Sequence, residues 1–482
     1  MAAHGRQGEE TTQVKIIFNL LTIFSAFVCL GDAYTLTLSP GNNTNIPYLV
    51  AVMPPGTQFV FQPGVYRIPQ ITPRDNDVFT GMSGAILNGS IQITSFVPSG
   101  SYWVIPNQSQ KGIVIGDCGT TSPMCSHPES VYFDNQPLQP VANLSSLASG
   151  TFFFDYQNNV IYLADNPNNH TVEVSVVPAA ISGSAQNVTV QGLTIEKFSN
   201  PGQYGAVGGL YPGPGWIVQN NEIRLNHGAG VTLSSNGQAS GNYIHHNGEI
   251  GITTGDTTYQ QMYSLLVQNN ELAYNNWAGY NLGWASGGLK LANAVGPIIR
   301  NNYVHDNLGM GLWTDQNSSN VLYDSNRVQN NTGDGIHHEL SYSATISNNI
   351  ITGNYWPGNP WYWGAQIMIQ NSSNVIAYNN TLEVLADRGN GIVIVQQNRG
   401  GPWISANNYI HDNTITYDGA QGGTGSAGDY LVAQLISTNN NVFQSNHYKA
   451  PDTTAYHWTW DQPKNWAGFQ ADGQDTQGTL SH

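Results

Sequence analysis

Asp315 and Glu339 are the residues whose types and spacing are best suited to chemistry. Each stands four residues after a glycine, Gly311 or Gly335, within two similar stretches of sequence. Two carboxyl groups held side by side repel each other, so one keeps its proton while the other ionises. Such a pair supplies an acid beside a base or nucleophile.

Further polar and aromatic side chains are expected beside this pair. Lys290, Trp313 and His337 each stand two residues after the leading glycine of their stretch, between aliphatic positions. Side chains alternate along a strand, so these three should point outward in a column next to the two carboxyl groups. Gln370 takes the same position as the carboxyl residues in the next stretch, if Gln366 replaces the leading glycine.

These stretches belong to a repeat that runs from about residue 181. An apolar strand, an Asn pair, a second strand, another Asn, a Gly and a third strand recur with a period of roughly 24 residues, which is typical of a parallel β-helix. Ile217-Val218-Gln219-Asn220-Asn221 begins one copy. Asn suits such a corner because it tolerates left-handed backbone and can hydrogen-bond to its counterpart one coil away.

The coil spacing suggests which reaction the carboxyl pair would support. Neighbouring coils stack about 4.8 Å apart, which would place the two carboxyl groups about 5 Å from each other. That separation suits a retaining glycosidase, although an inverting reaction stays open. Each residue alone also has a structural interpretation: Asp315 and Glu339 as solvated strand ends, Trp313 as surface packing, and His338 as a core histidine bonded to Thr314.

Two aromatic insertions, residues 277–284 and 355–363, flank the pair along the chain. Their Trp284, Trp361 and Trp363 offer flat apolar faces for sugar rings, and we expect them to bind substrate. Packing against the coil wall is the alternative. Asp334 is interpreted as a turn former.

The charge balance restricts the partners. The chain has 482 residues, 14 Lys and Arg against 30 Asp and Glu, and a formal net charge of -16. This disfavours nucleic acid and anionic membranes, which require basic surface, and it mildly disfavours polyanionic substrates. No metal-ligand spacing emerges, so neither a metal nor a cofactor is expected, and nothing indicates Ca²⁺.

The apolar stretch Ile16–Leu30, followed by small residues, predicts a signal peptide over residues 1–33 and therefore export. An uncleaved anchor is the alternative. Cys118 and Cys125 flank a short loop; they either close a disulfide, which export permits, or stay free thiols.

The rest of the chain divides into four regions. We predict an N-terminal cap with the first coils over 34–99, a small inserted β subdomain over 100–178, the β-helix over 179–447 and a C-terminal cap over 448–482. The fold class is therefore all-β, a single-stranded right-handed parallel β-helix.

The runs Gly311-Leu312-Trp313-Thr314-Asp315 and Gly335-Ile336-His337-His338-Glu339 resemble the β-helical glycoside hydrolases, in particular the β-xylosidases of family 120 and the related family 141. The resemblance covers the central coils. It implies that Asp315 is the nucleophile and Glu339 the general acid/base. Outside this pair the motif is unspecific, and the loops that would select a sugar match nothing in these families.

Three functions remain open. The first is a secreted, retaining glycoside hydrolase acting on a neutral polysaccharide or oligosaccharide. The second is a polysaccharide lyase or epimerase with Lys290 as base, which usually needs Arg or Ca²⁺; Arg300 and Arg327 fall early in their coils, away from the outward column. The third is a non-catalytic, glycan-binding surface protein. The oligomeric state is not predicted.

Overall fold

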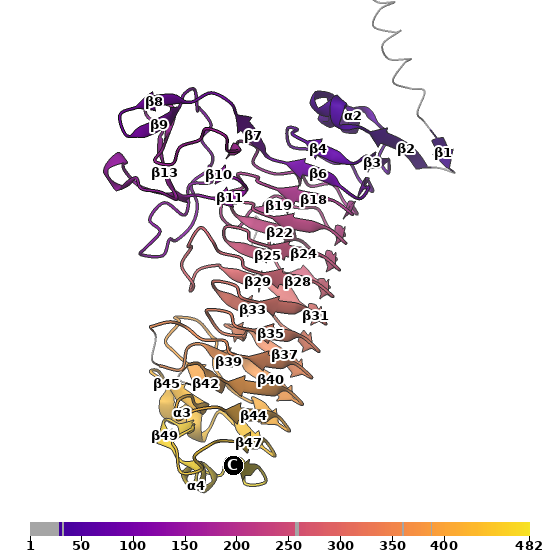
Figure 1. Cartoon of the computed structure of the whole chain (residues 1–482). Helices are drawn as coiled ribbons and strands as arrows, with labels where there is room; N and C mark the ends of the chain where they lie inside the picture. The colour runs from indigo at the N-terminus through magenta and orange to yellow at the C-terminus, as the bar shows by residue number, and fades with distance from the viewer. Residues whose placement is uncertain (1–27, 31–32, 256–259, 359–360, 387) are drawn as a thin grey trace, which may run out of the picture.

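The apolar triplets of the repeat form short strands, and the Asn and Gly residues between them form the bends. We analysed a computed structural model, which describes residues 28–30, 33–255, 260–358, 361–386 and 388–482. Three strands make one coil, and the coils stack in chain order (Figure 1). Strands of the same rank in successive coils pair side by side, so the molecule has three long sheets of parallel strands.

The first sheet contains β1 (Val28–Leu30), β2 (Ala33–Leu38), β3 (Gln58–Phe61), β5 (Val78–Gly81), β17 (Thr189–Gln191), β20 (Ile217–Gln219), β23 (Gln238–Ser240), β27 (Leu266–Gln268), β31 (Ile298–Arg300), β34 (Val321–Asp324), β37 (Tyr342–Ser347), β40 (Ser373–Tyr378), β43 (Tyr409–His411) and β46 (Val442–Gln444). The second contains β4 (Gly64–Tyr66), β6 (Ala85–Asn88), β18 (Thr194–Glu196), β21 (Glu222–Arg224), β24 (Tyr243–His245), β28 (Glu271–Ala273), β32 (Tyr303–His305), β35 (Arg327–Gln329), β38 (Ile350–Thr352), β41 (Thr381–Val384), β44 (Thr414–Tyr417), β47 (His447–Lys449) and β50 (Thr479–Ser481). The third contains β16 (Ile181–Ser182), β19 (Gly205–Gly208), β22 (Ala229–Leu233), β25 (Ile250–Thr254), β29 (Gly287–Ala292), β33 (Met310–Asp315), β36 (Ile336–Glu339), β39 (Ala365–Gln370), β42 (Asn390–Gln396), β45 (Thr424–Gly428), β48 (Trp458–Trp460) and β49 (Gln462–Lys464).

The core fills the inside of the coils. The aliphatic residue that follows each leading glycine of the third sheet points inward, as predicted, and is fully buried. These residues are Val231, Ile252, Leu289, Leu312, Ile336 and Ile392. They stack in one register from coil to coil, so a single apolar column runs along the molecule.

The two residues of each Asn pair have different structural roles. The first Asn adopts left-handed backbone, as Asn301 does with φ 54°. The second is buried and bonds to the equivalent Asn of the next coil: Asn326 Oδ1 accepts from the backbone N of Asn302 at 3.1 Å and from its Nδ2 at 3.0 Å. The predicted coil-to-coil Asn bonding is therefore confirmed, and it leaves few buried amide groups of the corner unsatisfied.

A separate lobe interrupts the early coils (Figure 1). One small sheet contains β7 (Ser90–Ile93), β10 (Val131–Phe133), β11 (Gln136–Pro137) and β15 (Val172–Ser175). The other contains β8 (Val97–Ser99), β9 (Tyr102–Ile105), β12 (Gln139–Pro140), β13 (Thr151–Asp155) and β14 (Val160–Leu163). The lobe has its own apolar cluster, which includes Phe152, Phe154 and Ile161. Below, it is called the inserted subdomain.

The parallel pairing continues past residue 447. β48 pairs with β45, and β50 pairs with β47. β49 then turns back antiparallel to β48, and the helix α4 (Trp466–Ala471) packs its Phe469 against Phe443 of the last coil. The described residues also form the α-helices α2 (Ile46–Val52) and α3 (Val432–Ser437), and a two-stranded sheet joins β26 (Met262–Tyr263) to β30 (Ala294–Val295).

Most of the expected signal peptide lies outside the described residues. Its described part, β1, pairs antiparallel with β2. Within the part of the chain that the structure describes, no helix is both long and apolar enough to cross a bilayer.

Candidate functional site

The third sheet brings the predicted site residues together in the register expected from the repeat. Lys290 pairs with Trp313, and Trp313 pairs with His337. Asp315 ends β33 beside Ala292, and Glu339 ends β36 beside Gln370. Because successive strands of the sheet lie about 4.8 Å apart, the carboxyl groups and their neighbours occupy one patch of the outer face of β29, β33, β36 and β39.

Asp315 is held by a lysine of the preceding coil. The Lys290 Nζ lies 3.0 Å from the Asp315 Oδ2 and donates to the backbone oxygen of Trp284 at 2.8 Å. The same ammonium lies 3.5 Å from the centre of the Trp313 ring, a cation–π contact. The backbone N of Gln316 donates to the other Asp315 oxygen at 2.7 Å. Both oxygens of this carboxylate therefore have polar partners.

Glu339 is held by a residue that sequence reasoning missed. Its Oε1 accepts from Arg399, which follows β42, and its Oε2 accepts from Trp313 Nε1 at 3.1 Å. Arg399 lies in the segment where the repeat lapses, so indexing the coils could not place it. Of the arginines, only Arg300 and Arg327 were considered from the sequence, and the arginine that contacts Glu339 is Arg399.

His337 joins the patch to Asp334, which was interpreted from the sequence as a turn former. The His337 Nδ1 lies 3.1 Å from the Asp334 Oδ2, and its Nε2 contacts Gln370 Oε1 at 3.0 Å. Asp334 is fully buried and also accepts from the Ala365 backbone N at 2.7 Å, so it is more than a turn former. Burial lowers the pKa of His337, but the nearby carboxylates, above all Asp334, outweigh it and raise the pKa overall.

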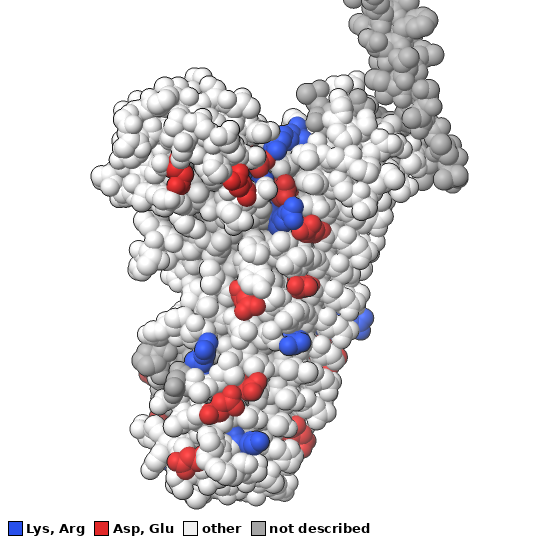
Figure 2. Space-filling model, in the orientation of Figure 1, with Lys and Arg blue, Asp and Glu red and all other residues white. Residues whose placement is uncertain are grey.

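The patch is far less solvated than an outward strand face would be. The side chains of Asp315, Glu339 and Lys290 are 8%, 5% and 14% exposed. The alternative interpretation from the sequence, in which the two carboxyl groups are solvated strand ends and Trp313 is surface packing, is therefore wrong. Figure 2 shows few charged side chains on one face of the molecule. By contrast, four charged side chains meet in this patch: Lys290, Asp315, Glu339 and Arg399.

His338, by contrast, is structural. It points inward, its Nδ1 contacts the Thr314 Oγ1 at 2.7 Å, and burial lowers its pKa to about 3. The structural interpretation made from the sequence is confirmed: a neutral histidine tied to Thr314 in the core.

A hollow of about 640 Å³ opens directly onto Asp315. Lys290, Gln316, Arg399 and Trp284 also line it. The residues that complete the lining are Ile115, Gly202, Gln203, Tyr204, Leu210, Tyr211, Thr253, Thr254, Gly255, Met262, Gly283, Ala292 and Asn293. This hollow is called the Asp315 cleft below. Glu339, Trp313, His337 and Gln370 do not line it, but Glu339 contacts Arg399, which does.

Trp361 and Trp363 line a different hollow of about 740 Å³, together with Trp356 and Arg388. They also pack on an apolar patch of β39 and β42 that includes Met368. Trp363 approaches the patch around the carboxyl groups through His337, with ring centres 6.5 Å apart. The two aromatic insertions thus line separate hollows on the third sheet.

A third carboxyl group lies beneath the Asp315 cleft. Glu249 is fully buried just before β25, and its Oε2 accepts from the backbone N of Gln203, a cleft residue, at 2.5 Å. Burial raises the pKa of Glu249 to about 8, so it is uncharged at neutral pH. Sequence reasoning had no means of finding it, because an isolated Glu outside the repeat positions carries no pattern.

The comparisons with known proteins concern the fold. The family model described as a right-handed β-helix region matches residues 259–359, and no curated protein matches the sequence. A solved structure of XylC in complex with xylose is 15% identical and covers 93% of this chain and 86% of its own, with a TM-score of 0.68. The A-module of the mannuronan C-5 epimerase AlgE6 of Azotobacter vinelandii is 13% identical, with coverages of 88% and 90% and a TM-score of 0.48. The family model and the XylC structure show that the chain is a right-handed parallel β-helix, which confirms the predicted fold class.

Proposed function

We propose that the protein is an exported glycoside hydrolase that cleaves a neutral oligosaccharide or polysaccharide with Asp315 and Glu339. One observation carries this proposal. Asp315 lines a cleft while Glu339 ends the next strand of the same sheet, and each carboxylate is paired with a cation, Lys290 or Arg399. Burying a charge costs free energy, so two buried ion pairs on neighbouring strands add little net stability. Their presence at one place therefore favours a catalytic role.

In the proposed reaction Asp315 is the nucleophile. Its carboxylate attacks the anomeric carbon of a sugar in the cleft, and the bond from that carbon to the leaving oxygen breaks. Glu339 must first take up a proton from solvent, which it gives to the leaving oxygen. It then takes a proton from the water that attacks the glycosyl-enzyme and releases Asp315. Lys290 and the Gln316 amide hold the Asp315 carboxylate in one orientation, so it is already aligned for attack on the anomeric carbon. The Arg399 guanidinium occupies one oxygen of Glu339, so the leaving group must displace or share that contact.

Two further features support a sugar substrate. The cleft combines Trp284 and two tyrosines with amide and hydroxyl groups, which suits the apolar faces and hydroxyls of a sugar ring. The fold is that of XylC, whose structure contains xylose, a neutral sugar. Trp361 and Trp363, in the neighbouring hollow, would hold more distant units of the same chain.

One observation supports the lyase or epimerase alternative, and another argues against it. Arg399 in the cleft supplies a cation that could face a uronate carboxylate. Lys290, however, is bound to Asp315 and to the Trp284 carbonyl and lies on the Trp313 ring, which leaves it poorly placed to act as a base. We therefore favour hydrolysis.

The test is a screen of aryl glycosides and plant polysaccharides, with the anomer of the first product read by NMR. We expect cleavage with retained configuration, a loss of at least about a thousandfold in kcat for Asp315→Ala and Glu339→Gln, and full activity for Asp412→Asn at an exposed carboxyl. Full activity in both site variants, or an absorbance rise from unsaturated products, would refute the assignment. An inverted product would retain the pair but replace the nucleophile by a base.

A further inference from the structure

The Cys118–Cys125 disulfide closes a short loop of the inserted subdomain. Of the two outcomes left open by the sequence, the structure has the bonded one. Cys125 is buried against Ala278 and Tyr280, which belong to the coil that precedes β29. The bond therefore lies at the junction between the inserted subdomain and the coils.

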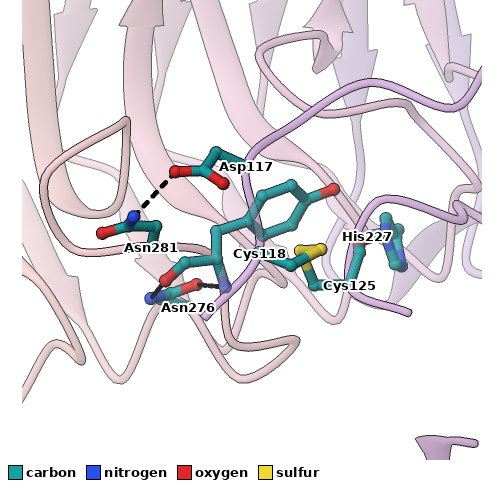
Figure 3. Close-up of a disulfide and its surroundings, with 7 residues drawn as sticks. Asp117, Cys118, Cys125, His227, Asn276 and Asn281 are labelled. Carbon is teal, nitrogen blue, oxygen red and sulfur yellow. Dashed lines mark hydrogen bonds between the residues drawn. A yellow bond between two sulfur atoms is a disulfide. The ribbon is translucent and has the colours of Figure 1, made fainter. Parts of the chain in front are cut away.

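The two segments at this junction are joined by backbone and side-chain hydrogen bonds. Cys118 and Tyr280 form an antiparallel bridge, and the Gly119 N donates to the Gly279 O at 2.9 Å. Asn281 donates twice to Asp117, from its backbone N to the backbone oxygen at 2.9 Å and from Nδ2 to Oδ2 at 2.7 Å (Figure 3). The loop at 276–284 thus gains a strand-like partner outside its own coil.

The backbones of the two segments, at residues 116–122 and 279–280, lie so close together that neither can shift along the other. A Cβ added to Gly116, whose φ is 135°, would lie 2.4 Å from Cε1 of the Tyr280 ring. A Cβ added to Gly279, whose φ is 82°, would lie 2.2 Å from the Ser122 Oγ. Only glycine fits at such contacts, so the fit between the two loops is specific.

An unbroken series of contacts leads from this junction to the candidate nucleophile. The Tyr280 N donates to Asn276 Oδ1 at 2.8 Å, and its ring stacks on Trp284 with centres 5.8 Å apart. The Trp284 carbonyl accepts from Lys290 Nζ at 2.8 Å, and Lys290 lies 3.0 Å from Asp315. Trp284 and Lys290 also line the Asp315 cleft.

We propose that the Cys118–Cys125 loop is a positioning element of the site: it fixes the loop at 276–284, and through Tyr280 and Trp284 it fixes Lys290 against Asp315. The inference rests on the proposed function. It assigns a catalytic consequence to the inserted subdomain, which contributes neither member of the carboxyl pair. It also makes the site sensitive to reduction, since a dithiol reductant converts the bond to two thiols and is itself oxidised to a disulfide.

The first measurement is hydrogen exchange by mass spectrometry on the full chain, which needs no substrate. In the Cys118→Ser/Cys125→Ser variant, and in the parent protein after reduction, we expect peptides covering 277–284 to exchange at least about tenfold faster. Peptides covering β33 and β36 should be unchanged. Asn281→Ala, which keeps the disulfide, should give a smaller effect of the same kind, and Asn158→Ala, in an exposed turn of the inserted subdomain, none. Unchanged exchange at 277–284 would overturn the proposal.

The second measurement is a double-mutant cycle on kcat with Lys290→Ala. Loss of the disulfide should lower kcat about tenfold in the parent and less than twofold in the Lys290→Ala background, because its effect passes through that lysine. Losses that multiply would show that the disulfide acts by another route and would refute the positioning role. If no glycoside is cleaved by the parent, the proposed function fails, and the exchange experiment alone decides whether the loop is fixed by the bond.

Discussion

Lys290 and Asp315 face each other from neighbouring coils, with the ammonium nitrogen 3.0 Å from a carboxylate oxygen and both side chains largely buried. Removing one member of a buried pair leaves the other charge uncompensated. Lys290→Ala should therefore lower the free energy of unfolding by about 2–4 kcal/mol, and kcat by at least about a hundredfold. Urea unfolding and steady-state kinetics test this, with Lys449→Ala, at an exposed position of β47, as the control. Equal stability of the two variants would contradict it.

Glu249 should make the stability depend on pH. Its pKa is raised from 4.5 to about 8 by burial, so between these values the unfolded chain has lost a proton that the folded chain keeps. Stability contributed by this group therefore falls as pH rises through that window, by up to about 5 kcal/mol, and is level above it.

Glu249→Gln should remove this loss. Chemical unfolding at pH 5 and pH 8.5 would show a smaller decline in the variant than in the parent protein. A decline of equal size in both proteins would mean that other groups, such as Asp77, whose pKa burial raises to about 6, account for it.

The Asn bonding between coils should contribute strongly to stability. Asn326→Ala would remove the acceptor of two Asn302 groups and the donor to the Ile299 carbonyl, all buried, at a cost of about 3–5 kcal/mol. Asn301→Gly, at the neighbouring position with φ 54°, should change the stability little, because glycine accepts that backbone conformation. Thermal unfolding of the two variants provides the comparison.

The hollow lined by Trp361 should matter only for long substrates. Trp361→Ala is expected to raise KM about tenfold for an oligosaccharide and to leave an aryl monoglycoside unaffected, since the Asp315 cleft is separate. Trp361→Phe, which keeps an aromatic face, should restore most of the affinity. An equal effect on both substrates would indicate that the residue only supports the coil.

The sequence predicts what the repeat controls and little else. Lys290, Trp313 and His337 could be aligned because each occupies a fixed position after a glycine, and one strand register then places them side by side. Arg399 follows a strand end in a segment with no period, so its approach to Glu339 depends on a loop path that no pattern encodes. The burial of Glu339 was missed in part for the same reason, because Arg399, which lies outside the repeat, contacts it.

The contact between Asp117 and Asn281 joins residues that are 164 positions apart. Each coil otherwise contacts mainly its neighbours, so the solenoid can form progressively from local pairings, as stacked repeats do. The wall of the cleft cannot form in this way, because Asp117 of the inserted subdomain can contact Asn281 only after the coil that carries Asn281 has formed. Closing so long a loop is slow. Assembly of the site is therefore expected to be a late event in folding, after most of the coils between the two segments have formed.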